Sequence, residues 1–313
     1  MRPTALLVMM PLLLPSASMA ETFRFTTLNP VVPNYLLRWP QAINDRGDVL
    51  FNGINSTTFA PDAIFIQTKK RLSRVRFPGT QPTTARGTAL SADGTVGGVI
   101  NSVNEIGGTF FELRHDGKLR TMPPAPAGAD SAFYAMNDKG DFTMSGVNNS
   151  SCDHAYFFTN GAYFPIQYPG VTRYTAGGIS NDGTVVGTLL DLEEGFMLRK
   201  GVFTLFTFPG ADATHADCVS DNSRYICGSY FVGSGEQHAY VWDRHNEFTK
   251  FDYPAPNTIN GIHGLETLQH FSTSITGVND KGEVCGLCTA RYGSNMGSEV
   301  VQFNCTAEPH GRP

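Results

Sequence analysis

The sequence has few charges and no strong cluster of basic residues. Only 16% of its 313 residues are charged, and 28 acidic against 23 basic residues give a formal net charge of −5. The one short basic run is Lys69-Lys70-Arg71. Nucleic acids and anionic membranes are bound by clustered Lys and Arg. We therefore expect neither as a partner of this protein.

Several short motifs with a known chemistry are also absent. The sequence has no Gly-x-Ser-x-Gly nucleophile elbow, no phosphate loop ending in Gly-Lys-Ser or Gly-Lys-Thr, no His-Glu-x-x-His zinc motif and no calcium loop with alternating acids. These absences exclude the common hydrolase, nucleotidase and metalloprotease signatures. We expect no cofactor and no bound metal.

Long apolar runs are missing as well, apart from one near the N-terminus that is too short to span a bilayer. This run extends from Ala5 to Leu14, follows Arg2, contains Pro11 and is succeeded by small residues up to Ala20. The order of charged residue, short apolar run and small residues is typical of a secretory signal peptide. We predict a signal peptide at 1–20, a single domain at 21–313, no membrane span, and a secreted or periplasmic product.

Export decides how the six cysteines are interpreted, because an oxidising compartment favours disulfides. Sequence alone leaves many pairings open. Cys218 and Cys227 flank a polar turn at 220–223, so an antiparallel hairpin would bring them together, and we predict a disulfide there. Cys285 and Cys288 have the spacing of a redox motif, but they lie in a predicted strand rather than at a helix N-terminus. Structural disulfides are therefore favoured over a redox or zinc role, with unpaired core thiols as a further alternative.

Glycine and proline are abundant, at 33 and 19 residues, and 22 Phe and 11 Tyr supply side chains that suit strands. An aliphatic residue followed by a polar turn recurs six times, at Ile43–Gly47, Leu90–Gly94, Met136–Gly140, Ile179–Gly183, Val219–Ser223 and Val278–Gly282. Further short apolar strands follow each turn. A repeat of about 40 to 50 residues with four strands is typical of one propeller blade.

The two ends of the chain fit this repeat in a complementary way. The sixth copy stops after its third strand, at Val300 to Phe303, whereas a spare strand, Phe23 to Pro30, precedes the first copy and resembles Phe203 to Pro209. Joining them would remove an unpaired sheet edge. We predict an all-β, six-bladed β-propeller of four-stranded antiparallel blades in which the N-terminal strand closes the last blade. Neither a β-helix nor a β-sandwich would explain the missing fourth strand at the C-terminal end and the spare strand at the N-terminal end.

Two strands begin with His-Ala-Tyr, at His154 and His238, and several blades end in an aromatic residue followed by Pro-Gly, as at Tyr168 to Gly170. This pattern resembles the extracellular HAF-type repeat over roughly residues 22–305. It is strongest in blades three to five, and Asp62 and Thr109 replace the His in blades one and two. The resemblance implies an exported, bacterial repeat protein. It brings no established activity and therefore no catalytic residues.

Ligand sites in propellers usually lie around the channel mouth, on the face opposite the polar turns, which is an analogy from fold. An insertion around 259–273 carries His263, Glu266 and His270, whose spacing would place them on one face of a short helix over the channel. A solvated capping loop is nevertheless the favoured interpretation of this insertion. The other candidate ligand-binding residues are Tyr174, Asp212 and His215. His154 and His238 recur at equivalent positions, which favours a structural hydrogen bond.

These observations favour a secreted, monomeric binding protein without catalysis, with a glycan or an extracellular protein as ligand at the loop-rich channel face. The alternative is a carbohydrate-active enzyme, a polysaccharide lyase or glycoside hydrolase. In that case His215, Asp212, His263 or Tyr174 would supply acid and base.

Overall fold

The structure is a computed structural model. It describes residues 23–28, 30–79, 81–101, 108–124, 126, 131–148, 151–233, 236–245, 247–261, 264–294 and 297–309. The predicted signal peptide and His263 lie outside these ranges. The described residues form strands and no helix, so no helix among them could cross a membrane.

Five of the six sheets are blades of four antiparallel strands in chain order. Blade 1 has β2 (Tyr35–Ile43), β3 (Val49–Asn55), β4 (Ala63–Gln67) and β5 (Leu72–Arg74). Blade 2 has β6 (Ala85–Leu90), β7 (Val96–Ile100), β8 (Thr109–Leu113) and β9 (Leu119–Thr121). Blade 3 has β10 (Ser131–Met136), β11 (Phe142–Asn148), β12 (Ser151–Thr159) and β13 (Ala162–Pro165). Blade 4 has β14 (Tyr174–Ile179), β15 (Val185–Leu189), β16 (Glu194–Arg199) and β17 (Val202–Phe206). Blade 5 has β18 (Ala213–Val219), β19 (Tyr225–Val232), β20 (Glu236–Asp243) and β21 (Phe248–Phe251).

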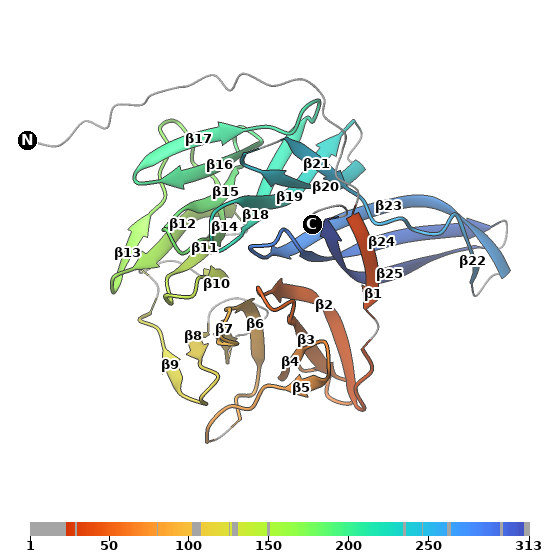
Figure 1. The fold of residues 1–313 in the computed structure, drawn as a ribbon, viewed down its shortest axis with the longest axis horizontal. Coiled ribbons are helices and arrows are strands. Elements are labelled where there is room, and N and C mark those ends of the chain that lie inside the picture. Colours follow the sequence, from red (N-terminus) through yellow and green to blue (C-terminus); the bar gives the residue numbers. More distant parts are fainter. Residues whose placement is uncertain are drawn as a thin grey trace, which may run out of the picture.

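The sixth sheet confirms the predicted closure of the ring. It contains β22 (Thr258–Gly261), β23 (Gly264–Val278), β24 (Val284–Ser294), β25 (Gly297–Pro309) and β1 (Phe23–Leu28), in the order β1-β25-β24-β23-β22. β1 is antiparallel to β25, from Phe23 opposite Pro309 to Leu28 opposite Asn304. The N-terminal strand thus forms the outer strand of blade 6, and the chain is a six-bladed β-propeller (Figure 1).

The polar turn begins with Asn in blades 1, 3 and 6 and with Ser in blades 2, 4 and 5, and the Asn side chain has two structural roles. The side-chain oxygen of Asn44 accepts hydrogen bonds from the backbone N–H groups of Arg46 and Asp48, which closes the turn. Its amide nitrogen donates to the carbonyl of Ser91 in the next blade at 3.2 Å. Asn137 donates in the same way to Ser180 at 2.9 Å, and Asn279 to Asn44 at 2.9 Å. One side chain therefore shapes its own hairpin and links it to the neighbouring blade.

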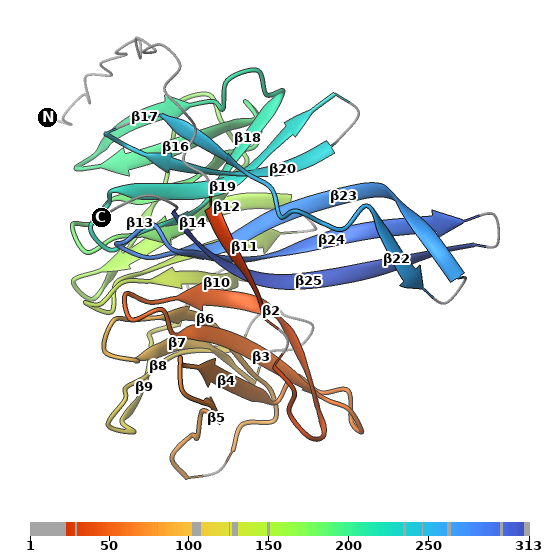
Figure 2. The same cartoon turned by 45° about the vertical axis from the view of Figure 1, so that its right-hand side comes forward.

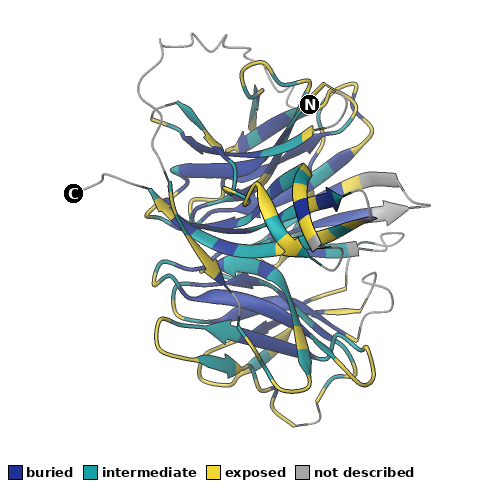
Figure 3. Cartoon of the chain, turned by 90° about the vertical axis from the view of Figure 1, so that its right-hand side faces the viewer, coloured by how far each residue is buried: buried dark blue, intermediate teal, exposed yellow. Residues whose placement is uncertain are grey.

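Hydrophobic layers fill the spaces between blades, and exposed residues gather at the loops (Figure 3). Between blades 2 and 3, for example, Phe142 is fully buried and stacks on Phe133 and Phe158 at 5.1 and 4.8 Å between ring centroids. At the closure, Phe23 and Phe25 of β1 contact Phe251 of blade 5 at 5.0 and 4.9 Å. The closing strand is therefore held by side chains as well as by its ladder.

The predicted disulfide is present between Cys218 of β18 and Cys227 of β19, which lie directly opposite each other. Cys285, Cys288 and Cys305 are buried free thiols within β24 and β25. Burial raises the pKa of Cys285 to about 12, of Cys288 to about 11 and of Cys305 to about 12. These thiols therefore stay protonated, and Cys285, Cys288 and Cys305 are unpaired core thiols rather than members of the favoured structural disulfides.

The described part of the insertion is β-structure, so it is neither the favoured capping loop nor a short helix. β22 pairs with the first residues of β23, Ile259 lying opposite Glu266, and β23 pairs with β24 from Thr267 to Val278. Together with β25 these strands extend beyond the ring as an arm (Figure 2). The arm has a small core of its own, in which Cys288, Ala290 and Tyr292 are fully buried. Cross-strand packing of this kind outweighs the helical spacing of Glu266 and His270 in determining the conformation of the segment.

Candidate functional site

The innermost strand of every blade contains a break in its ladder at the same point. The skipped residues are Gln41 in β2, Thr88 in β6, Tyr134 in β10, Gly177 and Gly178 in β14, Asp217 in β18 and Thr276 in β23. An unpaired residue of this kind is a β-bulge, which redirects its side chain. Gln41, Thr88, Tyr134, Gly177, Asp217 and Thr276 all line the central channel. We call these six residues the bulge ring.

The bulge ring was missed in the sequence, although a positional signal was there. Each of its members stands three residues before the first residue of the polar turn, as Gln41 does before Asn44 and Asp217 before Ser220. Within the ring the chemistry changes from blade to blade, while the turn itself is repeated. The signal becomes visible only once the repeats are aligned on their turns.

The channel is wide at one end and narrow at the other. Its wide part encloses about 590 Å³ and is lined by the first halves of the inner strands and by residues near the loop-rich face, such as Ile54, Pro61 and Leu190. Its narrow part encloses about 80 Å³ and reaches the polar turns at Asp45 and Asp221. The wide part therefore opens on the face that the sequence indicated for a ligand.

Polar and aromatic side chains share the wall of the wide part. Arg38 and Trp39 come from blade 1, and the guanidinium carbon of Arg38 lies 5.0 Å from the centroid of the Trp39 ring. Arg86 comes from blade 2, and Tyr134 from blade 3 is 39% exposed. Amide and hydroxyl groups from Gln41, Asn52, Thr88, Thr175 and Ser274 complete the lining. The wall offers donors, acceptors and ring faces to a polar ligand.

Among the described residues that line the wide part, His215 is the only histidine and Asp217 the only carboxylate. They stand two residues apart on β18 and both line the channel. The His215 Nε2 atom lies 3.8 Å from a carboxylate oxygen of Glu193, and the Ser229 hydroxyl donates to Asp217 at 3.4 Å. Asp217 is accessible from the channel, but burial of its carboxylate between the channel walls raises its pKa to about 6. The charge of His215 lowers this pKa, but by less than burial raises it. Asp217 therefore titrates near neutral pH.

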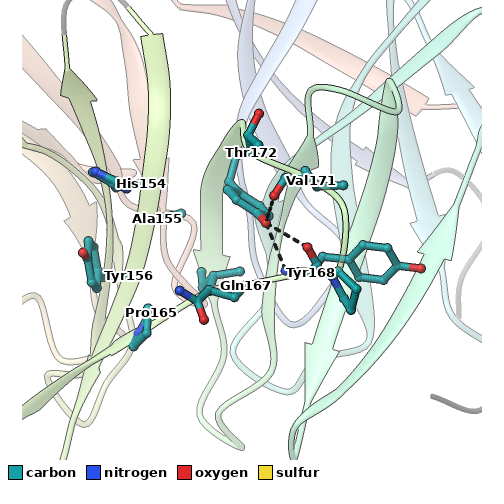
Figure 4. A pocket seen from close by; sticks show the side chains of 11 residues that line it. His154, Ala155, Tyr156, Pro165, Gln167, Tyr168, Val171 and Thr172 are labelled. Atoms are coloured by element: carbon teal, nitrogen blue, oxygen red, sulfur yellow. Dashed lines mark hydrogen bonds between the residues drawn. The ribbon is translucent and has the colours of Figure 1, made fainter. Parts of the chain in front are cut away.

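Tyr174, in contrast, is buried in a structural hydrogen-bond network. Its hydroxyl accepts a hydrogen bond from the Tyr168 N–H at 3.1 Å and donates to the Val171 carbonyl at 2.5 Å (Figure 4). Thr214 and Thr273 do the same for the next two blade connections, accepting from the N–H groups of Phe208 and Tyr253. The Tyr174 hydroxyl thus replaces a Thr hydroxyl of the repeat and holds a connection between blades.

The remaining predicted residues do not meet at the channel. Asp212 is exposed and accepts a hydrogen bond from the Gly233 N–H at 2.7 Å. Glu266 is fully buried within the arm, and His270 is exposed on the arm opposite Arg291. Of the five predicted residues that the structure describes, only His215 lines the wide part of the channel.

The repeated histidines differ between blades. The His238 Nδ1 atom lies 3.0 Å from an Asp252 carboxylate oxygen, and the imidazole stacks on Tyr230 at 5.1 Å between ring centroids. This arrangement is the structural hydrogen bond expected at that position. His154 is exposed and borders a groove of about 740 Å³ between strand β12 and the connection to blade 4. It lies on the side of β12 away from Val171 and Tyr168 (Figure 4).

Four carboxylates gather at the narrow end, where the polar turns meet. The N–H of Asn222 donates to Asp280 at 2.7 Å, and the N–H of Asp280 donates to Asp45 at 2.8 Å. Burial, together with the charges of Asp138, Asp280 and Asp45, raises the pKa of Asp221 to about 8. Among the described residues, no group of three or more His, Cys, Asp or Glu side chains is arranged to hold a metal ion.

No known protein family matches the chain, and no curated protein resembles it closely enough to count as a match. Solved structures with the same architecture exist. They share the fold of this chain. TolB from Acinetobacter baumannii has a TM-score of 0.50 and 11% identity, over 79% of this chain and 60% of that one. A prolyl endopeptidase has a TM-score of 0.50 and 10% identity, over 89% and 43%. Virginiamycin B lyase from Staphylococcus aureus has a TM-score of 0.49 and 14% identity, over 92% and 99%.

Proposed function

We propose that this protein is an exported binding protein that holds a glycan in the wide part of the channel. The observation that carries the proposal is the bulge ring. Residues at six equivalent positions line one cavity, and their chemistry differs. They are the amide Gln41, the hydroxyls Thr88 and Thr276, the phenol Tyr134, the carboxylate Asp217 and Gly177. Positions that only maintain a ring would keep similar chemistry from blade to blade, as the first turn position does with Asn or Ser. Varied chemistry at equivalent positions instead gives a cavity directional contacts for one ligand.

The size and chemistry of the cavity support a glycan over an apolar ligand. A volume of about 590 Å³ is in the range of small-molecule sites. Sugars present hydroxyl groups around their rims and weakly apolar faces. The hydroxyl and amide groups of the wall complement those rims, and Trp39 and Tyr134 supply apolar ring faces with a polar edge.

The compartment and the repeat family belong to the same proposal. The disulfide between Cys218 and Cys227 supports an oxidising location such as the periplasm or the cell exterior. The His-Ala-Tyr strands at His154 and His238 support membership of the HAF-type repeats.

The test is retention of purified residues 21–313 on a panel of immobilised polysaccharides, followed by calorimetry with the retained one. We expect Tyr134→Ala and Asp217→Asn to weaken binding by at least about tenfold each, which corresponds to roughly 1.4 kcal/mol. Asp116→Asn is the matched control, because Asp116 lies in an exposed turn and pairs with Lys118. Binding that neither channel variant changes would refute the channel as the site. If no polysaccharide is retained, the ligand is not a glycan.

A second function is favoured by one specific observation, the pair of His215 and Asp217 on the channel wall. A carboxylate with a pKa near 6 next to an imidazole can exchange protons with a substrate at neutral pH. In a carbohydrate-active enzyme this pair would supply general base and acid. New oligosaccharides detected by mass spectrometry, lost in both His215→Ala and Asp217→Asn, would establish catalysis. A rate that rises with pH through about 6 would assign the base to Asp217.

A further inference from the structure

One edge of the arm is open over a defined length. β24 pairs with β25 without a break in register from Val284 opposite Ala307 to Ser294 opposite Gly297. On the other side of β25, β1 covers only the residues from Asn304 to Pro309. Among the described strands, none pairs with the outer edge of residues 297–303. We call these residues the open edge.

The open edge lacks most of the features that protect sheet edges in soluble proteins, and Glu299 is its one charged residue. Its sequence, from Gly297 through Ser298, Glu299, Val300, Val301 and Gln302 to Phe303, contains no Lys and no Pro, and its ladder has no bulge. Natural edges are usually blunted by one of these devices. At its centre Val300 is 57% exposed. The opposite edge of the arm, in contrast, is covered by β22.

No described segment of the chain itself pairs with this edge. β1 begins with Phe23 opposite Pro309, which is the far end of β25 from the open edge. At the near end β1 stops at Leu28, and Pro30 and the exposed Val31 lead the chain away to β2. A strand that pairs with the open edge can be supplied by another molecule.

We propose that the occupant is the open edge of a second copy of this chain, paired antiparallel about a two-fold axis at Val300. In this register Val300 faces Val300, Glu299 faces Val301, Ser298 faces Gln302 and Gly297 faces Phe303. Glu299, the only charged residue of the segment, therefore does not lie opposite the Glu299 of the second copy. The β-branched pair Val300–Val300 and the aromatic–glycine pair Phe303–Gly297 would both stabilise the paired strands. Two identical patches related by a two-fold axis close upon themselves.

The length of the open edge fits this arrangement. The tip of one arm, where Ser294 pairs with Gly297, would meet the end of the other copy's β1, where Leu28 lies opposite Asn304. Residues 297–303 of each copy would then pair with the part of the other copy's β25 that β1 leaves unpaired. Because the arm extends beyond the ring, the two propellers remain apart (Figure 2).

The first experiment is sedimentation of residues 21–313. The unmodified protein is expected to sediment as a dimer, and Val300→Lys and Val300→Glu as monomers, since each would place like charges opposite each other. An equimolar mixture of the two variants is expected to form a mixed dimer again. Leu265→Lys is the control, because Leu265 is 68% exposed on the same arm but away from the open edge. A monomeric unmodified protein, or a mixture that stays monomeric, would overturn the proposal.

A second experiment tests the register without disturbing the charge. Val300→Cys is expected to give a disulfide-linked dimer on a non-reducing gel after mild oxidation with diamide. Gln302→Cys is expected to give none, because its opposite residue is Ser298. Equal cross-linking of the two variants, or none in either, would refute the two-fold pairing at Val300.

Discussion

Asp221 should make the stability of this protein decrease as the pH rises from about 4 to about 8. Its pKa is raised to about 8 in the folded protein by burial and by Asp138, Asp280 and Asp45, whereas an unfolded aspartate has a pKa of about 3.9. The folded state therefore binds more protons than the unfolded state between these values, so the free energy of unfolding falls with rising pH. Deprotonation places an additional negative charge at the narrow end of the channel.

The nearby lysines do not neutralise that charge. Lys139 and Lys281 lie on the same turns, but their ammonium groups donate to the backbone carbonyls of Asn181 and Asp45, at 2.5 and 2.7 Å. A shift of about four pKa units corresponds to at most about 5 kcal/mol. Asp221 is partly accessible to water, so we expect a smaller contribution of about 2 kcal/mol after screening. For a domain of this size that is a decrease in Tm of roughly 4 to 8 °C.

The assay is thermal unfolding of the protein and of Asp221→Asn at pH 5 and pH 8. The variant is expected to lose part of the pH dependence and to be the more stable of the two at pH 8. Asp182→Asn is the matched control. Burial alone would raise the pKa of Asp182, but hydrogen bonds from Ser223, Thr184 and Ser180 outweigh burial and lower it. That variant should therefore be less stable at both pH values. An unchanged pH dependence in Asp221→Asn would refute the reasoning.

Three further predictions concern stability. Phe142→Ala should destabilise the protein by about 3 to 5 kcal/mol, measured by urea unfolding, because the fully buried ring leaves a cavity between blades 2 and 3. Replacing both Cys218 and Cys227 by Ala should cost about 2 to 3 kcal/mol, and a reductant should then have no further effect on the melting curve. A chain that begins at residue 30 should aggregate, because the whole outer edge of β25 is then unpaired, and light scattering would detect this.

Local turn chemistry made most of the fold predictable from the sequence. The turn around Asn44 fixes a hairpin through its own side chain and backbone, so each copy identifies a blade wherever it occurs. The pairing of Phe23 to Leu28 with blade 6 followed from counting strands, and the disulfide followed from two cysteines flanking one turn. These features depend on residues that are close in sequence or on a simple count.

The candidate site depended on features that a sequence pattern does not fix. Tyr134 and Asp217 face the channel because a bulge redirects them, and a bulge exists only relative to a partner strand. Glu266 and His270 have a spacing compatible with a helix or a strand, and pairing with β22 and β24 decided between the two. Tyr174 looked like a ligand-facing aromatic residue until its hydroxyl was seen to replace that of Thr214 and Thr273 in the other blades.

The closing pair of β1 and β25 has a consequence for how the protein matures. Phe23 is separated in sequence from its partner Pro309 by all the other strands of the propeller. The final blade therefore cannot close until β25 has been synthesised. The earlier blades have partners close in sequence and can form in order. A nascent chain thus stays an open ring until β25 is available to pair with β1.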